Sequence, residues 1–148
     1  MAETIGSIID KLIITSLKNH YADAEHKKTS TKTQCSQLVT ELNSYIHEAS
    51  CGHIENLEFP QNKVYIKTST EIGSPTPDMT IGDLVTNLIE ANHQMWINQE
   101  LVYDFKSVPM EEKDEVIERC ATLNIERSEF MDAINIWFSE RLKNGDES

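Results

Sequence analysis

The chain has 148 residues, of which 39% are hydrophobic, and its 25 acidic and 13 basic residues give a formal net charge of −12. This length is typical of a single domain that buries a core without disulfides or a structural metal, so residues 1–148 are predicted to form one domain. The acidic balance repels phosphate backbones and anionic lipid, which argues against direct binding to nucleic acid or to a membrane.

The first predicted element is an amphipathic helix. From Thr4 to about Lys27, apolar residues recur at intervals of three and four, and Thr4 is a suitable N-cap. The polar stretch 27–33 predicts a turn, after which a second helix runs until it stops near Gly52. These two helices are expected to form a first hairpin over residues 4–52.

Residues 53–79 differ in character from the helices on either side. Leu57-Glu58-Phe59 and Val64-Tyr65-Ile66 flank a turn-like tetrapeptide, which indicates a short β-hairpin, and glycine and prolines follow. This segment is predicted to be an insertion that connects two helical parts. Connectors of this length are often functional or disordered.

A second helical pair is expected over residues 80–144. Apolar periodicity predicts a helix of roughly 25 residues from Thr80. Ser107 and Pro109, followed by Glu111, then predict the start of a last helix that continues to Gly145, because proline and carboxylates suit a first turn.

The two pairs begin with the same phrase. Thr4-Ile5-Gly6-Ser7-Ile8 at the start of the chain returns as Thr80-Ile81-Gly82-Asp83-Leu84, and apolar spacing continues after both. An internal repeat predicts two similar units that pack together. The predicted fold is therefore all-α, an antiparallel four-helix bundle built from two repeated hairpins with pseudo-twofold symmetry.

The three cysteines and the composition indicate a reduced compartment. No signal peptide or membrane-spanning run is seen, so the protein is expected in the cytoplasm, or in the host cytoplasm if a phage encodes it. His47, Cys51 and His53 resemble zinc ligands but have no fourth partner at a familiar spacing. We expect a helix end there, and neither a metal nor another cofactor.

Polar residues on the apolar helical faces are the candidate ligand-binding residues, because burying them costs energy unless they are paired or used. They could converge between helices, where bundles usually build their sites. The alternative is a structural network in which Asp10 pairs with Arg127 or Lys11 with Glu100, leaving Lys18 and His20 as surface residues. The candidates are Asp10, Lys11, Asn92, Trp96, Glu100, Asn124 and Arg127.

Three short motifs resemble an uncharacterised bacterial family of helical proteins. They are Ile9-Asp10-Lys11-Leu12, then Asn92-x3-Trp96-x3-Glu100, then Asn124-x2-Arg127. Leu101 stands where family members usually have an acidic residue. The resemblance implies an all-helical cytoplasmic protein of bacterial or phage origin and carries no established activity.

These features predict a non-catalytic protein that binds a small polar or anionic ligand, such as a nucleotide or sugar phosphate, between its hairpins or across a homodimer interface. Arg127 and Lys11 would meet the anion and Trp96 would stack on the ligand, while Asn92, Asn124 and Glu100 would orient it. A phage protein of this kind could sequester a host signalling nucleotide. The alternative partner is a basic protein surface, bound by an acidic inhibitor or DNA mimic.

An enzymatic alternative is a nucleotide pyrophosphohydrolase of the MazG type, in which two carboxylate pairs hold magnesium. The chain contains Glu112-x2-Glu115 and Glu129-x2-Asp132. Magnesium needs oxygen ligands that meet at one point, at about 2.1 Å. Both pairs are predicted on one uninterrupted helix, so they could share an ion only if that helix were broken or a second copy took part.

Overall fold

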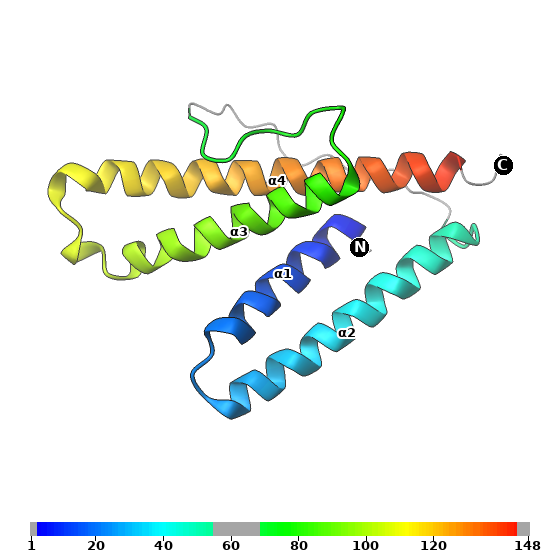
Figure 1. Cartoon of the computed structure of the whole chain (residues 1–148), viewed down its shortest axis with the longest axis horizontal. Coiled ribbons are helices and arrows are strands. Elements are labelled where there is room, and N and C mark those ends of the chain that lie inside the picture. The colour runs from blue at the N-terminus through cyan, green and yellow to red at the C-terminus, as the bar shows by residue number, and fades with distance from the viewer. Residues whose placement is uncertain (1–2, 55–68, 145–148) are drawn as a thin grey trace. The chain divides into compact units, whose positions relative to one another are not determined.

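The computed structural model describes residues 3–54 and 69–144, and these residues contain helices and no strands. The predicted all-α class is therefore confirmed for the described chain. The predicted strand–turn–strand segment over 57–66 lies outside the described residues. The elements are α1 (Ile5–Tyr21), α2 (Glu25–Ser50), α3 (Ile81–Tyr103), η1 (Phe105–Ser107), η2 (Met110–Glu112) and α4 (Lys113–Asn144) (Figure 1).

The chain divides into two compact units. The first consists of Met1–Gln61 and Met131–Ser148, which places α1, α2 and the last part of α4 together. The second is Asn62–Phe130, with α3, the two short 3₁₀ turns and the first part of α4. Among the described helices, none has both the length and the apolar character needed to cross a membrane.

The two copies of the sequence repeat begin their helices in the same way. The Thr4 hydroxyl accepts a hydrogen bond from the Ser7 amide, and the Ser7 side chain accepts one from the Thr4 amide. Thr80 and Asp83 form the same reciprocal pair at the start of α3. A capping box of this kind satisfies two backbone amides that have no partner within the helix. The predicted N-cap at Thr4 is confirmed.

The predicted turn over residues 27–33 is wrong. α1 ends at Tyr21, and α2 begins at Glu25 after only three connecting residues, so residues 27–33 are helical. The physical reason lies in the threonines of this stretch. Their hydroxyls donate to the carbonyl four residues earlier, from Thr29 to Glu25 and from Thr33 to Thr29, which satisfies polar side chains inside a helix.

Side-chain contacts fix how α1 and α2 lie against each other in the first unit. The Thr31 hydroxyl donates to Asn19 Oδ1 at 2.7 Å, and Ser16 Oγ lies 3.7 Å from Cys35 Sγ. Asn19 of α1 pairs with Thr31 of α2, and Ser16, earlier in α1, pairs with Cys35, later in α2. The two helices therefore run antiparallel (Figure 1). Apolar packing continues towards the start of α1, where Ile5 and Ile8 are buried.

Gly6 allows a close backbone approach in the first unit. Its amide donates to Asn135 Oδ1 at 2.7 Å, which supplies a partner for another of the free amides in the first turn of α1. A Cβ atom at position 6 would lie 2.6 Å from the Met131 carbonyl oxygen and 2.8 Å from Asn135 Oδ1. At the equivalent repeat position, Gly82, the nearest atom is the Thr80 hydroxyl at 3.7 Å.

In the second unit, α3 and α4 are joined through a buried amide. Asn98, which is 2% exposed, donates from Nδ2 to the Val116 carbonyl at 3.0 Å. The predicted helix start at Pro109 corresponds to a 3₁₀ turn that leads directly into α4. Not every residue of the apolar pattern is buried, because Ile117 is 56% exposed. The buried apolar side chains of this unit are Leu84, Leu88, Ala91, Met95, Val108, Val116, Leu123 and Phe130.

The two glycines of the repeat provide a matched test of this packing. Gly6→Ala should lower the free energy of unfolding by about 1–3 kcal/mol, because the added methyl group collides with backbone and with Asn135. Gly82→Ala should leave it unchanged or raise it by up to about 1 kcal/mol, since its methyl group has room and alanine favours helix. Denaturant unfolding followed by circular dichroism measures both. Equal unfolding midpoints for the two variants would contradict the close approach at Gly6.

Candidate functional site

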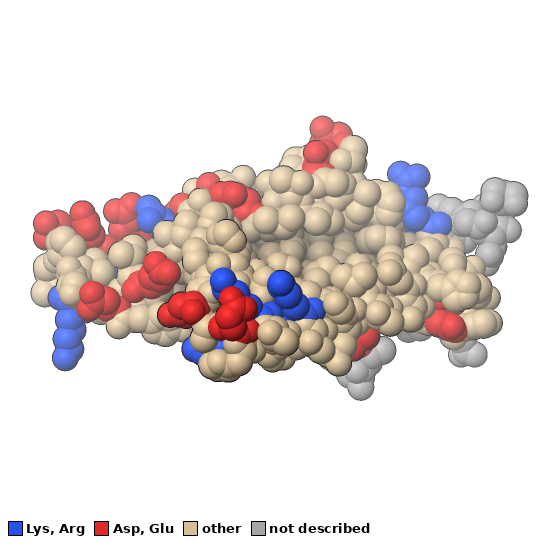
Figure 2. Space-filling view, turned by 60° about the horizontal axis from the view of Figure 1, so that its bottom comes forward, with Lys and Arg blue, Asp and Glu red and all other residues tan. Residues whose placement is uncertain are grey.

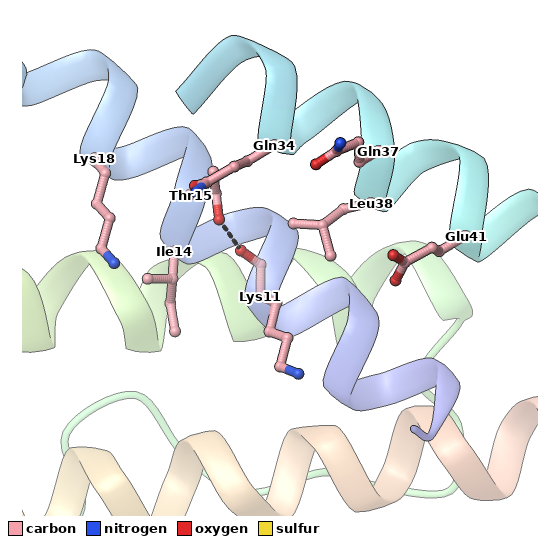
Figure 3. Close-up of a pocket in the computed structure, with 8 residues that line it drawn as sticks. All are labelled: Lys11, Ile14, Thr15, Lys18, Gln34, Gln37, Leu38 and Glu41. Carbon is pink, nitrogen blue, oxygen red and sulfur yellow. Dashed lines mark hydrogen bonds between the residues drawn. The ribbon is translucent and has the colours of Figure 1, made fainter. Parts of the chain in front are cut away.

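A groove of about 300 Å³ lies between α1 and α2 in the first unit (Figure 3). Each helix contributes four residues spaced i, i+3, i+4 and i+7, which places them on one face of that helix. The α1 residues are Lys11, Ile14, Thr15 and Lys18, and the α2 residues are Gln34, Gln37, Leu38 and Glu41.

The groove combines an apolar centre with polar sides. Ile14 and Leu38 are half-buried and extend from the two helices between the charged ends (Figure 3). Thr15 is buried, and its hydroxyl donates to the Lys11 carbonyl at 2.8 Å, so its oxygen keeps acceptor capacity. Lys18 and Gln34 lie towards the end of the groove nearest the α1–α2 turn, and Lys11 and Glu41 lie towards the other end.

The two lysines have different electrostatic surroundings. Lys11 Nζ lies 2.5 Å from Glu3 Oε1, and the Ser7 hydroxyl donates to the other oxygen of the same carboxylate. The hydrogen bond from Lys11, with a smaller contribution from Ser7, holds the pKa of Glu3 below its usual range. Lys18, by contrast, forms no ion pair with another residue of the described chain. Its ammonium group is thus the more available of the two.

Of the seven residues predicted to bind a ligand, the first unit contains Asp10 and Lys11. Lys11 lines the groove, whereas Asp10 is 4% exposed and lies among the buried residues of α1. Lys18, expected at the surface if the polar residues form a structural network, is exposed and also lines this groove. The i, i+3, i+4, i+7 spacing from Lys11 to Lys18 was the sequence signal for this shared face.

The other five predicted residues belong to the second unit. On α3, Asn92 is buried and donates to the Leu88 carbonyl at 3.1 Å, Trp96 is half-buried, and Glu100 is exposed. On α4, Asn124 is exposed and Arg127 is half-buried. The Asn92 amide nitrogen already donates within its own helix. Asn92 therefore has one fewer donor with which to orient a ligand. Ligand binding by these five residues stays a prediction.

Glu126 has a role that the sequence did not reveal. This fully buried α4 carboxylate accepts hydrogen bonds from the backbone amides of Glu71 and Ile72, both at 2.9 Å, and of Gly73 at 3.3 Å. Gly73 has φ 120°, a conformation that favours glycine. A carboxylate that accepts several backbone amides is held by charge-assisted hydrogen bonds, so Glu126 anchors the described part of the connector to α4.

Two neighbouring contacts support the same attachment. The Ser69 and Thr122 hydroxyls lie 2.5 Å apart, and Arg119 Nε lies 3.4 Å from a Glu71 carboxylate oxygen. Thr122 and Glu126 are one turn apart on α4, and Arg119 precedes Thr122 by three residues, so the three share a helical face. This face of α4 is therefore covered by the described end of the connector, residues 69–73.

The histidines and cysteine near the end of α2 form pairs. Cys51 Sγ lies 3.7 Å from His47 Nε2, and His53 Nδ1 lies 2.6 Å from Glu48 Oε2. The helix ends as predicted near Gly52, whose φ of 77° suits a helix C-terminus. Across residues 3–54 and 69–144, no three or more His, Cys, Asp or Glu side chains are arranged to hold a metal ion.

The arrangement of α4 bears on the magnesium-dependent alternative. α4 continues without interruption from Lys113 to Asn144. Glu115 and Glu129 are therefore separated by about 21 Å along a single helix axis. One of the two conditions under which the carboxylate pairs could share one ion, a break in this helix, is therefore not met.

Comparisons with protein families, curated proteins and solved structures find no match to this chain. The resemblance inferred from the three short motifs therefore gains no support from them. The functional argument rests on the residues of the site.

Removing the Glu126 carboxylate should release the connector. Glu126→Gln should lower the free energy of unfolding by about 1.5–3 kcal/mol, because an amide cannot accept the same set of charge-assisted hydrogen bonds. Amide hydrogen exchange at residues 71–73 should accelerate in the same variant. Glu118→Gln is the matched control, since Glu118 is exposed on the same helix. Unchanged exchange at residues 71–73 in Glu126→Gln would show that this carboxylate does not hold the connector.

Proposed function

We propose that the protein binds a small anionic ligand, such as a nucleotide or sugar phosphate, without catalysing its conversion, and that the α1–α2 groove is the binding site. The volume of about 300 Å³ and the mixture of apolar and polar lining residues support the proposal. Small-molecule sites usually combine these properties, and this groove is at the small end of their range. A groove of this size favours a single small molecule, such as one nucleotide, over a polymer chain.

The observation that carries the proposal is that two lysines of α1, Lys11 and Lys18, line this groove. Residues 11–41, which span both sides of the groove, contain five lysines and three acidic residues, whereas the rest of the chain contains eight basic and 22 acidic residues. The face in Figure 2 shows carboxylates scattered with a few basic side chains among them. Because salt screens charges over about 8 Å, the local lysines affect a ligand in the groove more than distant carboxylates do.

The groups of the groove suit binding and orientation. The Lys18 ammonium can donate to an anionic group, and the two glutamine amides can donate to or accept from its polar substituents. Lys11 contributes less in this proposal because it already pairs with Glu3. The apolar surfaces of Ile14 and Leu38 would support a sugar or base. We also propose that the chain forms an antiparallel bundle of two repeated hairpins. The matching capping boxes at the starts of α1 and α3 support this arrangement.

The test is binding of phosphate-containing ligands to lysine variants. Wild-type protein should be stabilised thermally by at least one member of a panel of nucleoside monophosphates, cyclic dinucleotides and sugar phosphates; a ligand at 100 times its dissociation constant adds about 2.7 kcal/mol. Lys18→Gln should weaken binding of that ligand about two- to fivefold, since an exposed charge pair contributes about 0.2–1 kcal/mol. Isothermal titration calorimetry gives the dissociation constants.

Lys27→Gln is the matched control for this test. It removes the same charge from α2 at an exposed position that does not line the groove. Its affinity should stay within twofold of wild type. No binding by any member of the panel, or equal losses in the two variants, would contradict a specific anion site at Lys18.

In a second candidate function, this acidic chain binds the basic surface of a partner protein. One feature of the second unit favours it. Near the α3–α4 connection, Tyr103 is 85% exposed and Met110 is 79% exposed. Residues 100–118 also contain seven acidic and two basic residues. Exposed aromatic and methionine side chains within a charged surround are typical of protein interfaces.

A photo-crosslinking amino acid at position 103 tests this second function. It should capture one discrete protein from the native cell extract, whereas the same amino acid at exposed position 29 on α2 should not. The captured protein, once purified, should bind wild-type chain at least tenfold more tightly than the Tyr103→Ala, Met110→Ala variant, because buried aromatic anchors dominate interface energies. Equal crosslinking at positions 103 and 29 would count against an interface here.

A further inference from the structure

The groove between α1 and α2 is electrically asymmetric along its length. Gln34 and Glu41 are seven residues apart on α2, as Lys11 and Lys18 are on α1, so each pair spans about 10 Å. The contacts of Asn19 with Thr31 and of Ser16 with Cys35 fix the register of the two helices. Lys18 is consequently near the Gln34 end, and Glu41 is near the Lys11 end (Figure 3).

The two ends have opposite unbalanced charge. At one end, Lys18 forms no ion pair with a described residue, and the α2 residue that lines this end, Gln34, is neutral. At the other end, Glu3 already neutralises Lys11, at 2.5 Å. Glu41 forms no ion pair within the described chain either, so it is the charge left over at that end.

The middle of the groove separates these charges with uncharged groups. Ile14 and Leu38 supply apolar surface there, and Gln37 supplies an amide at the side (Figure 3). A ligand with a single anionic group would use Lys18 alone, whereas a ligand with an opposite charge for each end would complement both Lys18 and Glu41.

We propose that the ligand of this groove is zwitterionic, with an anionic phosphate or carboxylate at Lys18 and an ammonium group at Glu41, separated by about 10 Å along the helix axes. This inference rests on the proposed function, because it assumes that the groove binds an anion. It adds that Glu41 selects an amine-bearing ligand. Since both charges are exposed, the selectivity expected from the ammonium group is about two- to fivefold.

A pair of ligands that differ only in the amine tests the proposal. The probes are 6-aminohexyl phosphate, whose chain separates phosphate and ammonium by a length comparable to the groove, and hexyl phosphate, which lacks the amine. Dissociation constants come from NMR titration of ¹⁵N-labelled protein at low ionic strength. Wild-type protein should bind 6-aminohexyl phosphate two to five times more tightly than hexyl phosphate.

Variants separate the contributions of the two ends. Glu41→Gln should remove the preference by weakening the amine-bearing ligand alone, whereas Lys18→Gln should weaken both ligands. Glu25→Gln, which removes an exposed carboxylate of α2 outside the groove, should preserve the preference. An NMR spectrum of each free variant that matches wild type away from the substitution establishes that the fold is retained.

The outcomes distinguish this inference from the proposed function. If hexyl phosphate binds as tightly as 6-aminohexyl phosphate to wild-type protein, the zwitterion proposal is overturned while anion binding stands. If neither ligand causes a shift at the groove residues, anion binding there fails, and the zwitterion proposal fails with it. If Glu25→Gln reduces the preference as much as Glu41→Gln, the selectivity arises from overall charge and the assignment to Glu41 is wrong.

Discussion

The register between α1 and α2 is the constraint on which the candidate site depends. It is set by the hydrogen bond from Thr31 to Asn19 and by the contact of Ser16 with Cys35. A one-residue change of register would rotate the lining stripe of α2 by about 100° relative to α1. After such a change, Gln34 and Glu41 would no longer border the groove.

The threonines of α2 explain why this register exists at all. A run of hydroxylated and charged residues over 27–33 has the composition of a turn, and the sequence pattern predicted one. Within the helix, the hydroxyls donate to the carbonyl four residues earlier, so these polar side chains keep a hydrogen-bond partner. Thr31 does this and also reaches Asn19. Because the segment is helical, α2 extends back far enough to place Gln34 opposite the last turns of α1.

The sequence was most informative where structure depends on near neighbours. The repeated Thr-Ile-Gly phrase predicts the starts of α1 and α3, because a capping box involves residues only three positions apart. It was least informative for Glu126, whose partners are 53 to 55 positions away in a connector without regular periodicity. It also could not distinguish Gly6 from Gly82, since the difference comes from the approach of Asn135, 129 residues later.

Lys18 and Glu126 show why residue type alone is a weak guide to function in this chain. A surface lysine on a helix usually has no role beyond solvation, and the role proposed for Lys18 rests on its place in the same groove lining as Leu38 and Gln34. A buried carboxylate, conversely, is a common sign of a functional site, yet Glu126 accepts backbone amides from its own chain. Its charge is already used to hold the connector. The charges that remain available for a ligand are the exposed ones, Lys18 and Glu41, so any selectivity at the groove must come from their placement along its length rather than from the strength of either charge.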